Sequence, residues 1–406
     1  MHSSRKLRSG AAVAALATTA LLISACSGPA TGGTGSDDAG PIVLGIHSTS
    51  SGSLAALGPD FEYGVRAGVS LATDGTNEID GREIQFVVLD DGSDAGAVPA
   101  QARGLLQQDQ PDLVFGPMSS ASAVSAAPIF ADAQVPAIFS ISATSDLTGF
   151  SPYTFRTSRD ALQEAQMGAA VADIQAGESF LVLAPDYAYG QSAAAAWQEN
   201  LTAAGGESVS EPIFAPLDSR DYTAVAERIR NASPDVLVVV TFAGSGGPTL
   251  WQNLGDAGIP DSSEVVTLLP QRDTIEAMGG VAPKLKYFAI YSASVPGDLN
   301  AQFVETFTEL SGGIEPDVYA GDSGVAGMIA VQAIREAGTT DSESVTAALS
   351  NLTGESIKGE FEVRAEDHTF LQSFYEATVG ADGAVTIVDT FTLEDSATPV
   401  ISPIEQ

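Results

Sequence analysis

Short apolar runs rich in β-branched residues alternate, from residue 41 onward, with longer segments whose apolar residues recur at helical spacing. Short runs of this kind, bounded by turn-forming residues, are typical of buried strands. Their alternation with helical segments predicts a parallel sheet covered by helices on both faces. In the first part of the chain we expect strands at 42–46, 84–89, 113–115 and 137–139, with helices at 60–72, 95–108 and 120–133.

The same alternation begins again after Tyr153-Thr154-Phe155-Arg156. Here we expect strands at 180–183, 207–214, 236–241 and 265–268, separated by helices at 191–203, 222–229 and 249–256. A strand at 287–291, helices at 301–310, 325–337 and 342–349, and strands at 359–363, 374–379 and 385–391 complete the chain. The repetition predicts an α/β protein of two similar units in tandem, each built on a doubly wound sheet.

Hydroxyl side chains gather in the turns that follow three of the predicted strands of the first unit. The turns are His47-Ser48-Thr49-Ser50-Ser51-Gly52, Gly116-Pro117-Met118-Ser119-Ser120-Ala121-Ser122 and Ser140-Ile141-Ser142-Ala143-Thr144-Ser145. Ligands of doubly wound sheets bind beyond the carboxyl ends of the strands, so we expect these turns to face one crevice. None of the three turns contains a Lys, Arg, Asp or Glu.

Ser119 and Ser120 stand at the predicted start of the helix at 120–133. Free backbone N–H groups and the positive end of the helix dipole favour an anion there, and a carboxylate would gain hydrogen bonds at once. Either serine alone is better explained as a helix N-cap. The convergence of three hydroxyl-rich turns favours a ligand-binding site.

The first 25 residues are typical of a signal peptide. Arg5, Lys6 and Arg8 precede an uncharged stretch from 10 to 23, which is shorter than the roughly 20 residues of a bilayer-spanning helix. Small residues then lead to Cys26, the only cysteine of the chain, in an arrangement that resembles the lipobox of bacterial lipoproteins. The resemblance implies cleavage before Cys26, lipidation of its sulfur and a flexible tether over 26–40. An ordinary thiol in a secreted protein is the alternative.

The chain is strongly acidic, with 52 Asp and Glu against 17 Lys and Arg and a formal net charge of −35. Loss of the three signal-peptide cations would take this charge to −38. Such a surface repels phosphate groups, so we expect no nucleic-acid partner. The single cysteine excludes an intramolecular disulfide, and with three histidines the chain offers no transition-metal motif. We therefore expect neither a metal nor a cofactor.

Six motifs follow one another in an order and spacing that resemble the leucine/isoleucine/valine-binding family of ABC-transporter receptors. They are Leu54-Ala55-Ala56-Leu57-Gly58-Pro59-Asp60-Phe61 with Gly64 and Arg66, Asp90-Asp91-Gly92-Ser93-Asp94, Gly116-Pro117-Met118-Ser119-Ser120-Ala121-Ser122, Ser142-Ala143-Thr144-Ser145-Asp146-Leu147-Thr148, Tyr153-Thr154-Phe155-Arg156 and Tyr189-Gly190-Gln191. The resemblance covers residues 42–379. It implies the type I periplasmic-binding fold, in which two α/β lobes joined by a three-segment hinge close on a ligand.

The resemblance also implies an organisation and partners for this chain. The implied lobes are 41–157 with 292–353 and 158–291 with 354–395, and the implied crossovers lie near 156–160, 290–295 and 352–359. The receptor would hand its small-molecule ligand to the permease and ATPase subunits of an importer. We expect a monomer, anchored through Cys26 to the outer face of the cytoplasmic membrane, or periplasmic where an outer membrane is present.

The same resemblance implies which residues contact the ligand. Ser120 and Thr144 match hydroxyls that hold the ligand carboxylate, and the Ser142 carbonyl matches one that receives the ammonium. Tyr189 matches a second-lobe aromatic that covers the ligand, with Tyr187 beside it. The expected ligand contacts are Ser51, Leu57, Ser119, Ser120, Ser142, Thr144, Tyr187, Tyr189, Ala243 and Asp322.

Two departures from the family pattern bear on the ligand. Amino-acid-binding members carry a second-lobe acid near 268–271, where this chain has no carboxylate before Asp273. An unpaired buried ammonium is costly, so either Asp322 replaces that acid or the ligand has no amine; Asp322 as a helix N-cap is the alternative. Small residues at 243–247 stand where an aromatic is common. We expect a branched-chain or other amino acid, or else an amide, a urea-like compound or an amine-free carboxylate.

Two other functions fit parts of the sequence. Gly321-Asp322-Ser323-Gly324 resembles the nucleophile segment of trypsin-like proteases, but it opens a predicted helix, and a serine nucleophile needs a general base. Only His47 and His368 follow the signal peptide, and neither has the flanking sequence of that family. We interpret His368 as structural and expect no enzyme. A sensor that presents its ligand to a membrane signalling protein is an alternative that the sequence does not separate from a transport receptor.

Overall fold

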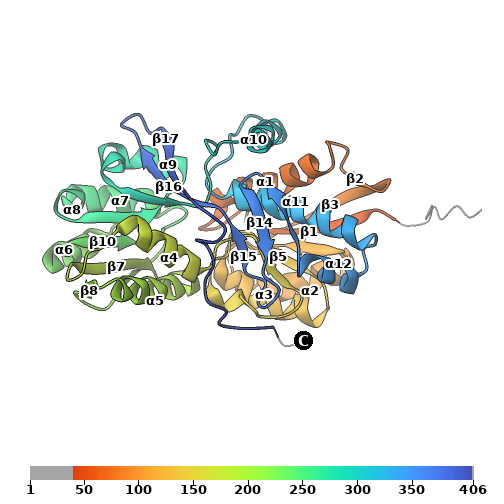
Figure 1. Cartoon of the computed structure of the whole chain (residues 1–406), viewed down its shortest axis with the longest axis horizontal. Helices are drawn as coiled ribbons and strands as arrows, with labels where there is room; N and C mark the ends of the chain where they lie inside the picture. The colour runs from red at the N-terminus through yellow and green to blue at the C-terminus, as the bar shows by residue number, and fades with distance from the viewer. Residues whose placement is uncertain (1–39, 405–406) are drawn as a thin grey trace, which may run out of the picture. The chain divides into compact units, whose positions relative to one another are not determined.

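The first of two large sheets has six strands in the order β2-β3-β1-β4-β5-β6 (Figure 1). The strands are β1 (Ile42–Ser48), β2 (Glu78–Ile79), β3 (Arg82–Asp90), β4 (Leu113–Phe115), β5 (Ala137–Phe139) and β6 (Thr154–Arg156). All neighbours pair in parallel except β2, which forms an antiparallel edge with β3. The computed structural model describes residues 40–404, so the expected signal peptide, Cys26 and most of the tether lie outside the described residues.

Helices cover this sheet on both faces, because alternate strand residues point to opposite sides. In β4, Leu113 and Phe115 join the larger apolar core, whereas Val114 joins a second core under the α2 and α3 helices. We call this sheet and the helices packed on it the first lobe. Its helices are η1 (Ala55–Leu57), α1 (Gly58–Ala72), α2 (Val98–Gln108), α3 (Ser120–Asp132), η2 (Ser145–Leu147), α10 (Asp298–Leu310), α11 (Ala320–Ala337) and α12 (Ser342–Leu349).

Glycines bring α1 and α11 into backbone contact. A Cβ atom at Gly68 would collide with the carbonyl oxygen of Gly324, and one at Gly327 would collide with that of Val65. The approach joins segments more than two hundred residues apart in sequence, since α11 returns to the first lobe after the chain has built the second sheet. The contact therefore packs α11, which follows the second sheet in the chain, directly against α1, which follows β1.

The second sheet has eight strands and the path β17-β16-β12-β11-β10-β7-β8, with β9 also paired to β7. Its parallel strands are β7 (Ser179–Pro185), β8 (Glu207–Ser208), β9 (Ile213–Ala215), β10 (Val236–Val239), β11 (Glu264–Leu268) and β12 (Lys286–Ala289). The antiparallel strands β16 (Phe374–Val379) and β17 (Val385–Phe391) extend the β12 edge. We call this sheet and its helices the second lobe; the two lobes lie side by side (Figure 1).

The second-lobe helices alternate with its strands along the chain, beginning with α4 before β7. They are α4 (Ala161–Ala172), α5 (Ala188–Ala203), α6 (Thr223–Ala232), α7 (Gly247–Asp256), α8 (Ile259–Ser262), α9 (Arg272–Met278) and η3 (Gly279–Lys284). A small antiparallel sheet of β13 (Thr353–Ser356), β14 (Gly359–Val363) and β15 (Phe370–Gln372) precedes β16. The segment at 352–359, expected as the third crossover, thus forms β13 and the turn into β14, and the chain reaches the second sheet at β16.

Most predicted elements form, and the exceptions have physical reasons. The strand expected at 207–214 is two short strands, β8 and β9, which pair with opposite ends of β7. The α4 helix was not predicted. It is buried on most sides, so its apolar residues do not follow the one-face period that marks an exposed amphipathic helix. The helix expected at 325–337 begins earlier, at Ala320.

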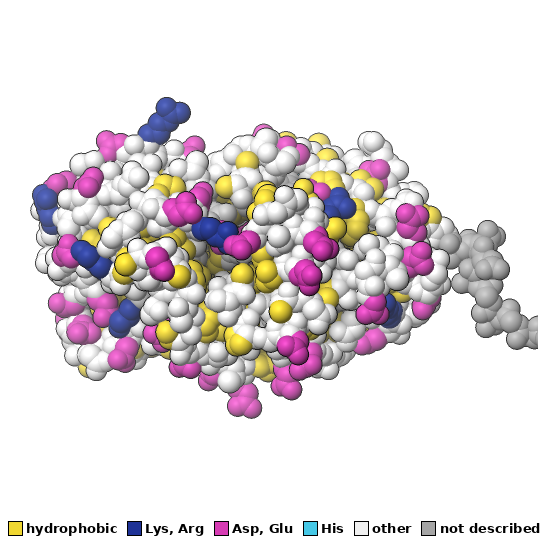
Figure 2. Space-filling model, turned by 90° about the horizontal axis from the view of Figure 1, so that it is seen from above, with side chains coloured by type: hydrophobic (Ala, Val, Ile, Leu, Met, Phe, Trp, Pro, Cys, Tyr) yellow, Lys and Arg dark blue, Asp and Glu magenta, His cyan; other side chains and the backbone are white. Residues whose placement is uncertain are grey.

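Acidic side chains are spread over the surface rather than gathered in one patch, as one face of the molecule shows (Figure 2). Fewer Lys and Arg side chains lie among them on that face. Within residues 40–404, no helix is both long enough and apolar enough to cross a membrane. In the same residues, no group of three or more His, Cys, Asp or Glu side chains is placed to hold a metal ion.

Candidate functional site

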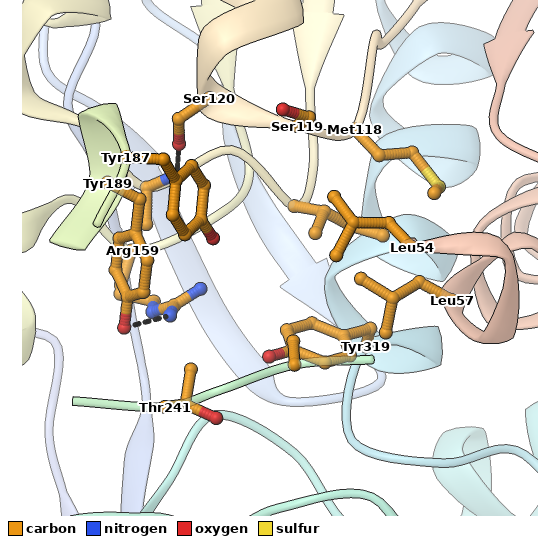
Figure 3. Close-up of a pocket in the computed structure, with 13 residues that line it drawn as sticks. Leu54, Leu57, Met118, Ser119, Ser120, Arg159, Tyr187, Tyr189, Thr241 and Tyr319 are labelled. Carbon is orange, nitrogen blue, oxygen red and sulfur yellow. Dashed lines mark hydrogen bonds between the residues drawn. The ribbon is translucent and has the colours of Figure 1, made fainter. Parts of the chain in front are cut away.

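A cavity lies where the carboxyl ends of strands from both sheets meet (Figure 3). It contains about 330 Å³ of space outside protein atoms, which includes space continuous with the solvent. Its lining residues are Leu54, Leu57, Met118, Ser119, Ser120, Ile141, Ala143, Arg159, Tyr187, Tyr189, Thr241, Ala243 and Tyr319. Leu54 and Leu57 after β1 and the turns after β4 and β5 supply the first-lobe wall, and the residues after β7 and β10 supply part of the second, in line with the rule for doubly wound sheets. The hydroxyl-rich turn at 47–52, expected to face the same crevice, contributes no lining residue.

The first-lobe wall contains the start of α3. Ser119 is the N-cap residue with extended backbone, and its side chain makes no capping hydrogen bond. The backbone N–H groups of Ser120, Ala121 and Ser122 consequently have no acceptor among the described residues. Unpaired N–H groups at a helix start favour an anion. This end of the cavity is therefore suited to a carboxylate.

The Ser120 hydroxyl links two of the hydroxyl-rich turns. Its Oγ accepts hydrogen bonds from the backbone N–H groups of Ala143 and Thr144, at 3.2 and 3.3 Å. Both interactions use the oxygen as an acceptor, so the hydroxyl proton remains available for donation. Ser120 is 3% exposed and lines the cavity. It can both fix the turn after β5 and donate to a ligand.

The second-lobe wall contains a buried arginine. Arg159 donates from Nε to Glu164 Oε2 at 3.0 Å, and its Nη2 lies 2.9 Å from the same oxygen. Nη2 also donates to the Tyr189 hydroxyl at 3.2 Å. Burial alone would lower the pKa of Arg159, but Glu164 and Tyr189 reverse that effect and raise it. The guanidinium therefore stays charged, in an ion pair whose side chains are 2% and 1% exposed.

The α4 helix begins next to Arg159 and holds this ion pair. Asp160 and Gln163 form a capping box, in which each side chain accepts from the backbone N–H of the other. Glu164 follows in the first turn, and its oxygens also accept from the Tyr189 hydroxyl at 2.9 and 2.8 Å. Both carboxylate oxygens are thus occupied, which leaves Glu164 no free acceptor for a ligand.

Three tyrosines complete the lining, two from the second lobe and one from the first. Tyr187 and Tyr189 flank the start of α5, with ring centroids 5.8 Å apart, and Tyr319 immediately precedes α11. Burial raises the pKa of Tyr319 to about 12, and it also raises the pKa of Tyr187 and Tyr189. All three phenols are therefore neutral at physiological pH, so Arg159 is the charged group of the lining.

Six of the ten residues expected from the sequence line the cavity. They are Leu57, Ser119, Ser120, Tyr187, Tyr189 and Ala243. Two others are held elsewhere. Ser51 is exposed and donates to Asp90 Oδ2 at 2.8 Å, and the Ser142 carbonyl accepts from Arg156 Nη2 at 2.9 Å and from the Ser158 hydroxyl at 2.6 Å. The Ser142 carbonyl is therefore engaged rather than open to an ammonium group.

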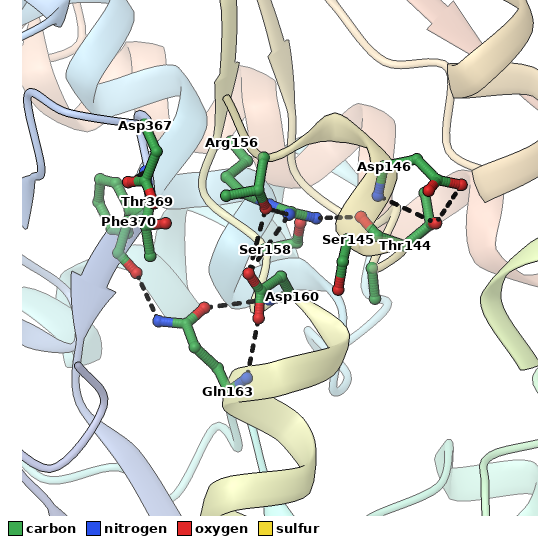
Figure 4. Close-up of polar contacts among 12 residues, drawn as sticks. Thr144, Ser145, Asp146, Arg156, Ser158, Asp160, Gln163, Asp367, Thr369 and Phe370 are labelled. Atoms are coloured by element: carbon green, nitrogen blue, oxygen red, sulfur yellow. Dashed lines mark hydrogen bonds and ion pairs between the residues drawn. The ribbon is translucent and has the colours of Figure 1, made fainter. Parts of the chain in front are cut away.

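Thr144 is fully buried and does not line the cavity. Its Oγ1 donates to Asp146 Oδ2 at 3.1 Å and accepts from the Asp146 N–H at 3.4 Å, which caps η2 (Figure 4). The Thr144 carbonyl accepts from Arg156 Nη2 at 3.3 Å. Ser120 and Thr144 were both predicted to bind the ligand carboxylate. Of the two, only Ser120 lines the cavity.

Asp322 also lies away from the cavity. Its Oδ1 is 2.8 Å from Lys358 Nζ, and both side chains are 0% exposed. Gln372 Nε2 donates to the same oxygen at 3.3 Å. The structure therefore does not bring Asp322 to the position of an ammonium partner, because an internal cation already neutralises it.

Seven lining residues were not among the expected ligand contacts: Leu54, Met118, Ile141, Ala143, Arg159, Thr241 and Tyr319. Arg159 had a detectable signal, since this cation stands directly before the Asp160 to Gln163 capping pattern at an expected crossover. Thr241 ends the strand predicted at 236–241, and the rule that ligands lie beyond strand ends applies to it as well.

The protease-like segment makes structural contacts. The Ser323 hydroxyl lies 3.1 Å from that of Ser140 and donates to the Tyr319 carbonyl. His368 stacks on Phe155 with centroids 4.2 Å apart and contacts the Thr154 carbonyl through Nδ1, while the nearest polar partner of His47 is Gln101. Neither histidine is hydrogen-bonded to Ser323 in the described chain.

Known proteins share this sequence pattern and architecture. Residues 41–384 match the model of a family described as periplasmic binding protein. The Leu/Ile/Val-binding protein homolog 6 of Brucella melitensis is 26% identical over 371 residues, which cover 88% of this chain and 93% of that protein. A solute-binding protein of an ABC transporter from Rhodopseudomonas palustris BisB5, solved in complex with 3,4-dihydroxybenzoic acid, has a TM-score of 0.78 and 25% identity, and the match covers 87% of this chain and 98% of that one.

A second solved structure from the same genus is similar to a comparable degree. It is described as an ABC-type branched-chain amino acid transporter from Rhodopseudomonas palustris CGA009 and has a TM-score of 0.75. Its identity is 26%, and the match covers 90% of this chain and 100% of that one. The relatives thus include proteins described for amino acids and one solved with an aromatic carboxylate.

Proposed function

The chain belongs to the periplasmic binding protein family, and from that premise we propose that it is the receptor of an ABC importer for a small carboxylate without an amine. Its two lobes would close on the ligand, and the closed form would be recognised by the permease. The observation that carries the choice of ligand is the charge of the cavity. Within the described residues, its thirteen lining side chains include Arg159 and no Asp or Glu.

An ammonium group would have no partner in such a cavity. Burying an unpaired charge is costly. Glu164 is occupied by Arg159 and Tyr189, and Asp322 lies away from the cavity in its pair with Lys358. A carboxylate, in contrast, would meet the free N–H groups of α3 and the Ser120 hydroxyl. The cavity would thus stabilise a carboxylate and leave an ammonium group unpaired, which favours an amine-free carboxylate over an amino acid.

The body of the ligand would lie against the apolar part of the lining. Leu54, Leu57 and Met118 gather on the side of the cavity away from Arg159 (Figure 3). Such a surface favours a hydrocarbon or aromatic body. The solved Rhodopseudomonas palustris relative in complex with 3,4-dihydroxybenzoic acid supports this class of ligand.

Matched ligands that differ only in the amine test the proposal. Leucine and 4-methylpentanoate share one carbon skeleton, as do phenylalanine and 3-phenylpropanoate. A ligand at 100 times its Kd stabilises the folded state by about 2.7 kcal/mol, which a thermal-shift measurement on the full-length protein detects. We expect the amine-free member of a pair to stabilise the protein. Stabilisation by the amino acid alone would contradict the proposal.

We further propose that Cys26 carries a lipid that holds the receptor at the outer face of the cytoplasmic membrane. The position of this lone cysteine after an apolar, uncharged stretch supports the idea. Mass spectrometry of the N-terminal peptide would show a diacylglyceryl modification. Cys26→Ser should release the protein from membranes, and a membrane-bound Cys26→Ser protein would contradict a lipid anchor at this residue.

A further inference from the structure

We infer that the second-lobe wall of the cavity recognises an uncharged oxygen at the far end of the ligand, so that the preferred ligand is a hydroxy- or oxo-substituted carboxylate. The inference rests on the proposed function, since it takes the carboxylate to lie at the start of α3. Ser119 and Ser120 are separated across the cavity from Arg159, Thr241 and Tyr319 (Figure 3). A ligand that spans the cavity therefore meets two different polar environments.

Arg159 has an unused donor at this wall. Its Nε and Nη2 atoms are committed to Glu164 and Tyr189, whereas Nη1 has no hydrogen-bond partner among residues 40–404. The side chain is 2% exposed and lines the cavity. A ligand oxygen that reaches Nη1 would gain a hydrogen bond from a charged donor, which is stronger than one from a neutral group.

Tyr187 offers a second unused group. Its hydroxyl makes no hydrogen bond within the described chain, and Figure 3 shows the ring between Ser120 and Arg159 with its hydroxyl directed into the cavity. A phenol can both donate and accept. Thr241 of the second lobe also lines the cavity, as does Tyr319, which precedes α11 of the first lobe. A ligand hydroxyl could therefore donate to one of these oxygens while it accepts from Arg159.

The charge at this wall decides against a second carboxylate. Glu164 neutralises Arg159 through a buried ion pair at 2.9 Å, and the three lining tyrosines stay protonated at physiological pH. The wall consequently presents donors without net positive charge. A second ligand carboxylate would be buried with no uncompensated cation to pair with, which is unfavourable, whereas a hydroxyl or carbonyl needs hydrogen bonds alone.

Two ligand series test the inference on the full-length protein by isothermal titration calorimetry. The aromatic series is benzoate, 4-hydroxybenzoate and terephthalate, and the aliphatic series is hexanoate, 6-hydroxyhexanoate and adipate. We expect the hydroxylated member of the series that binds to have a Kd about tenfold lower than the unsubstituted acid, as one or two added hydrogen bonds would give. The dicarboxylate should bind no more tightly than the unsubstituted acid.

A variant pair assigns the effect to the wall. Tyr187→Phe should bring the ratio of the two Kd values from about tenfold to about one to threefold, because it removes one hydroxyl partner. Tyr153→Phe is the matched control. It loses a hydroxyl that pairs with Gln134 outside the cavity, and it should keep the tenfold ratio.

The outcomes separate the two proposals. If carboxylates bind but the hydroxylated member has no advantage, or the dicarboxylate binds best, the inference is wrong and the proposed function stands. If neither series binds while an amino acid does, the proposed function itself is wrong and the inference falls with it. An unchanged ratio in Tyr187→Phe would overturn the assignment of the second-lobe wall.

Discussion

The guanidinium of Arg159 and the carboxylate of Glu164 form a fully buried ion pair, with Nη2 2.9 Å from Oε2 and side chains 2% and 1% exposed. The Tyr189 hydroxyl bonds to both partners, and Trp197 Nε1 donates to Glu164 Oε1 at 3.4 Å. One polar cluster thus joins α4, α5 and the wall of the cavity. Because this cluster engages Nε and Nη2 of Arg159, Nη1 is the nitrogen left to donate to a ligand.

Glu164→Gln should be strongly destabilising. It leaves the Arg159 charge buried without a counter-charge, and loss of one partner from a buried pair costs about 3–5 kcal/mol. Chemical denaturation followed by Trp fluorescence measures the change in the free energy of unfolding. The control is Glu227→Gln, whose partner Arg230 is 52% exposed and whose loss should cost less than about 1 kcal/mol. Equal effects of the two changes would contradict the burial argument.

Ser120→Ala should weaken both folding and binding. The change leaves the N–H groups of Ala143 and Thr144 without their acceptor, which costs about 1–3 kcal/mol for a buried group. It also removes the hydroxyl that would donate to the ligand, so we expect the Kd for a carboxylate to rise about tenfold. Calorimetry and denaturation measure the two effects separately.

Two further variants locate the carboxylate contact. Thr144→Ala removes the η2 cap at Asp146 and should lower stability with little change in Kd. Ser125→Ala loses a bond to the Ala121 carbonyl within α3 and should change neither by much. A larger rise in Kd for Thr144→Ala than for Ser120→Ala would restore Thr144 as the carboxylate ligand.

Gly244→Ala should hinder closure of the lobes. Gly244 has φ +100°, and a Cβ there would collide with the carbonyl oxygen of Ser53 in the first lobe. We expect a Kd at least about tenfold higher and a larger radius of gyration for the ligand-bound protein in small-angle X-ray scattering. The matched control is Gly258→Ala, where φ is +71° and no atom lies within 4 Å. Equal affinity losses in both variants would attribute the effect to backbone strain rather than to the contact between lobes.

Asp60 should make stability fall as pH rises. Its carboxylate accepts from the N–H groups of Asp317 and Tyr319, at 3.1 and 3.3 Å, and burial, with a contribution from Asp317, raises its pKa to about 8. A carboxyl whose pKa is raised in the folded state contributes stability that is complete below pH 4 and is lost as pH rises toward 8. Asp60 therefore opposes folding increasingly over that range.

Asp60→Asn removes this titration. The free energy of unfolding of the variant, relative to the parent, should rise between pH 5 and pH 8 by up to about 1.4 kcal/mol per pH unit. Urea denaturation at several pH values measures the slope. Asp94→Asn, at an exposed position, should follow the parent. Parallel pH profiles for Asp60→Asn and the parent would show that Asp60 titrates at its ordinary pKa.

The Asp322 and Lys358 pair should be structural. Lys358→Met or Asp322→Leu alone leaves one buried charge and should cost about 3–5 kcal/mol, whereas the double variant with both changes should cost much less than the two single changes together. A double-mutant cycle measures the coupling. If Asp322 were instead an ammonium partner, Asp322→Asn would weaken binding of amines selectively, which contradicts the present assignment.

Much of the fold could be predicted because its strands and helices carry local patterns. The buried strands β7 and β10 read as apolar runs, and the hydroxyl turns after β4 and β5 do meet at the cavity. Elements without an exposed face escaped prediction. The α4 helix is buried on most sides, so its sequence lacks amphipathic contrast. Its absence from the predicted elements also concealed Glu164 and the cluster around it.

The sequence by itself determined the tandem α/β architecture, the family, and six of the expected cavity residues, because periodicity and motif order are local properties of the chain. The tertiary structure decided which polar groups are free. Asp322, Ser142 and Thr144 are neutralised or hydrogen-bonded by Lys358, Arg156 and Asp146, and Lys358 is 36 residues from Asp322. Whether a side chain can bind a ligand depends on such partners, which only the folded chain brings together.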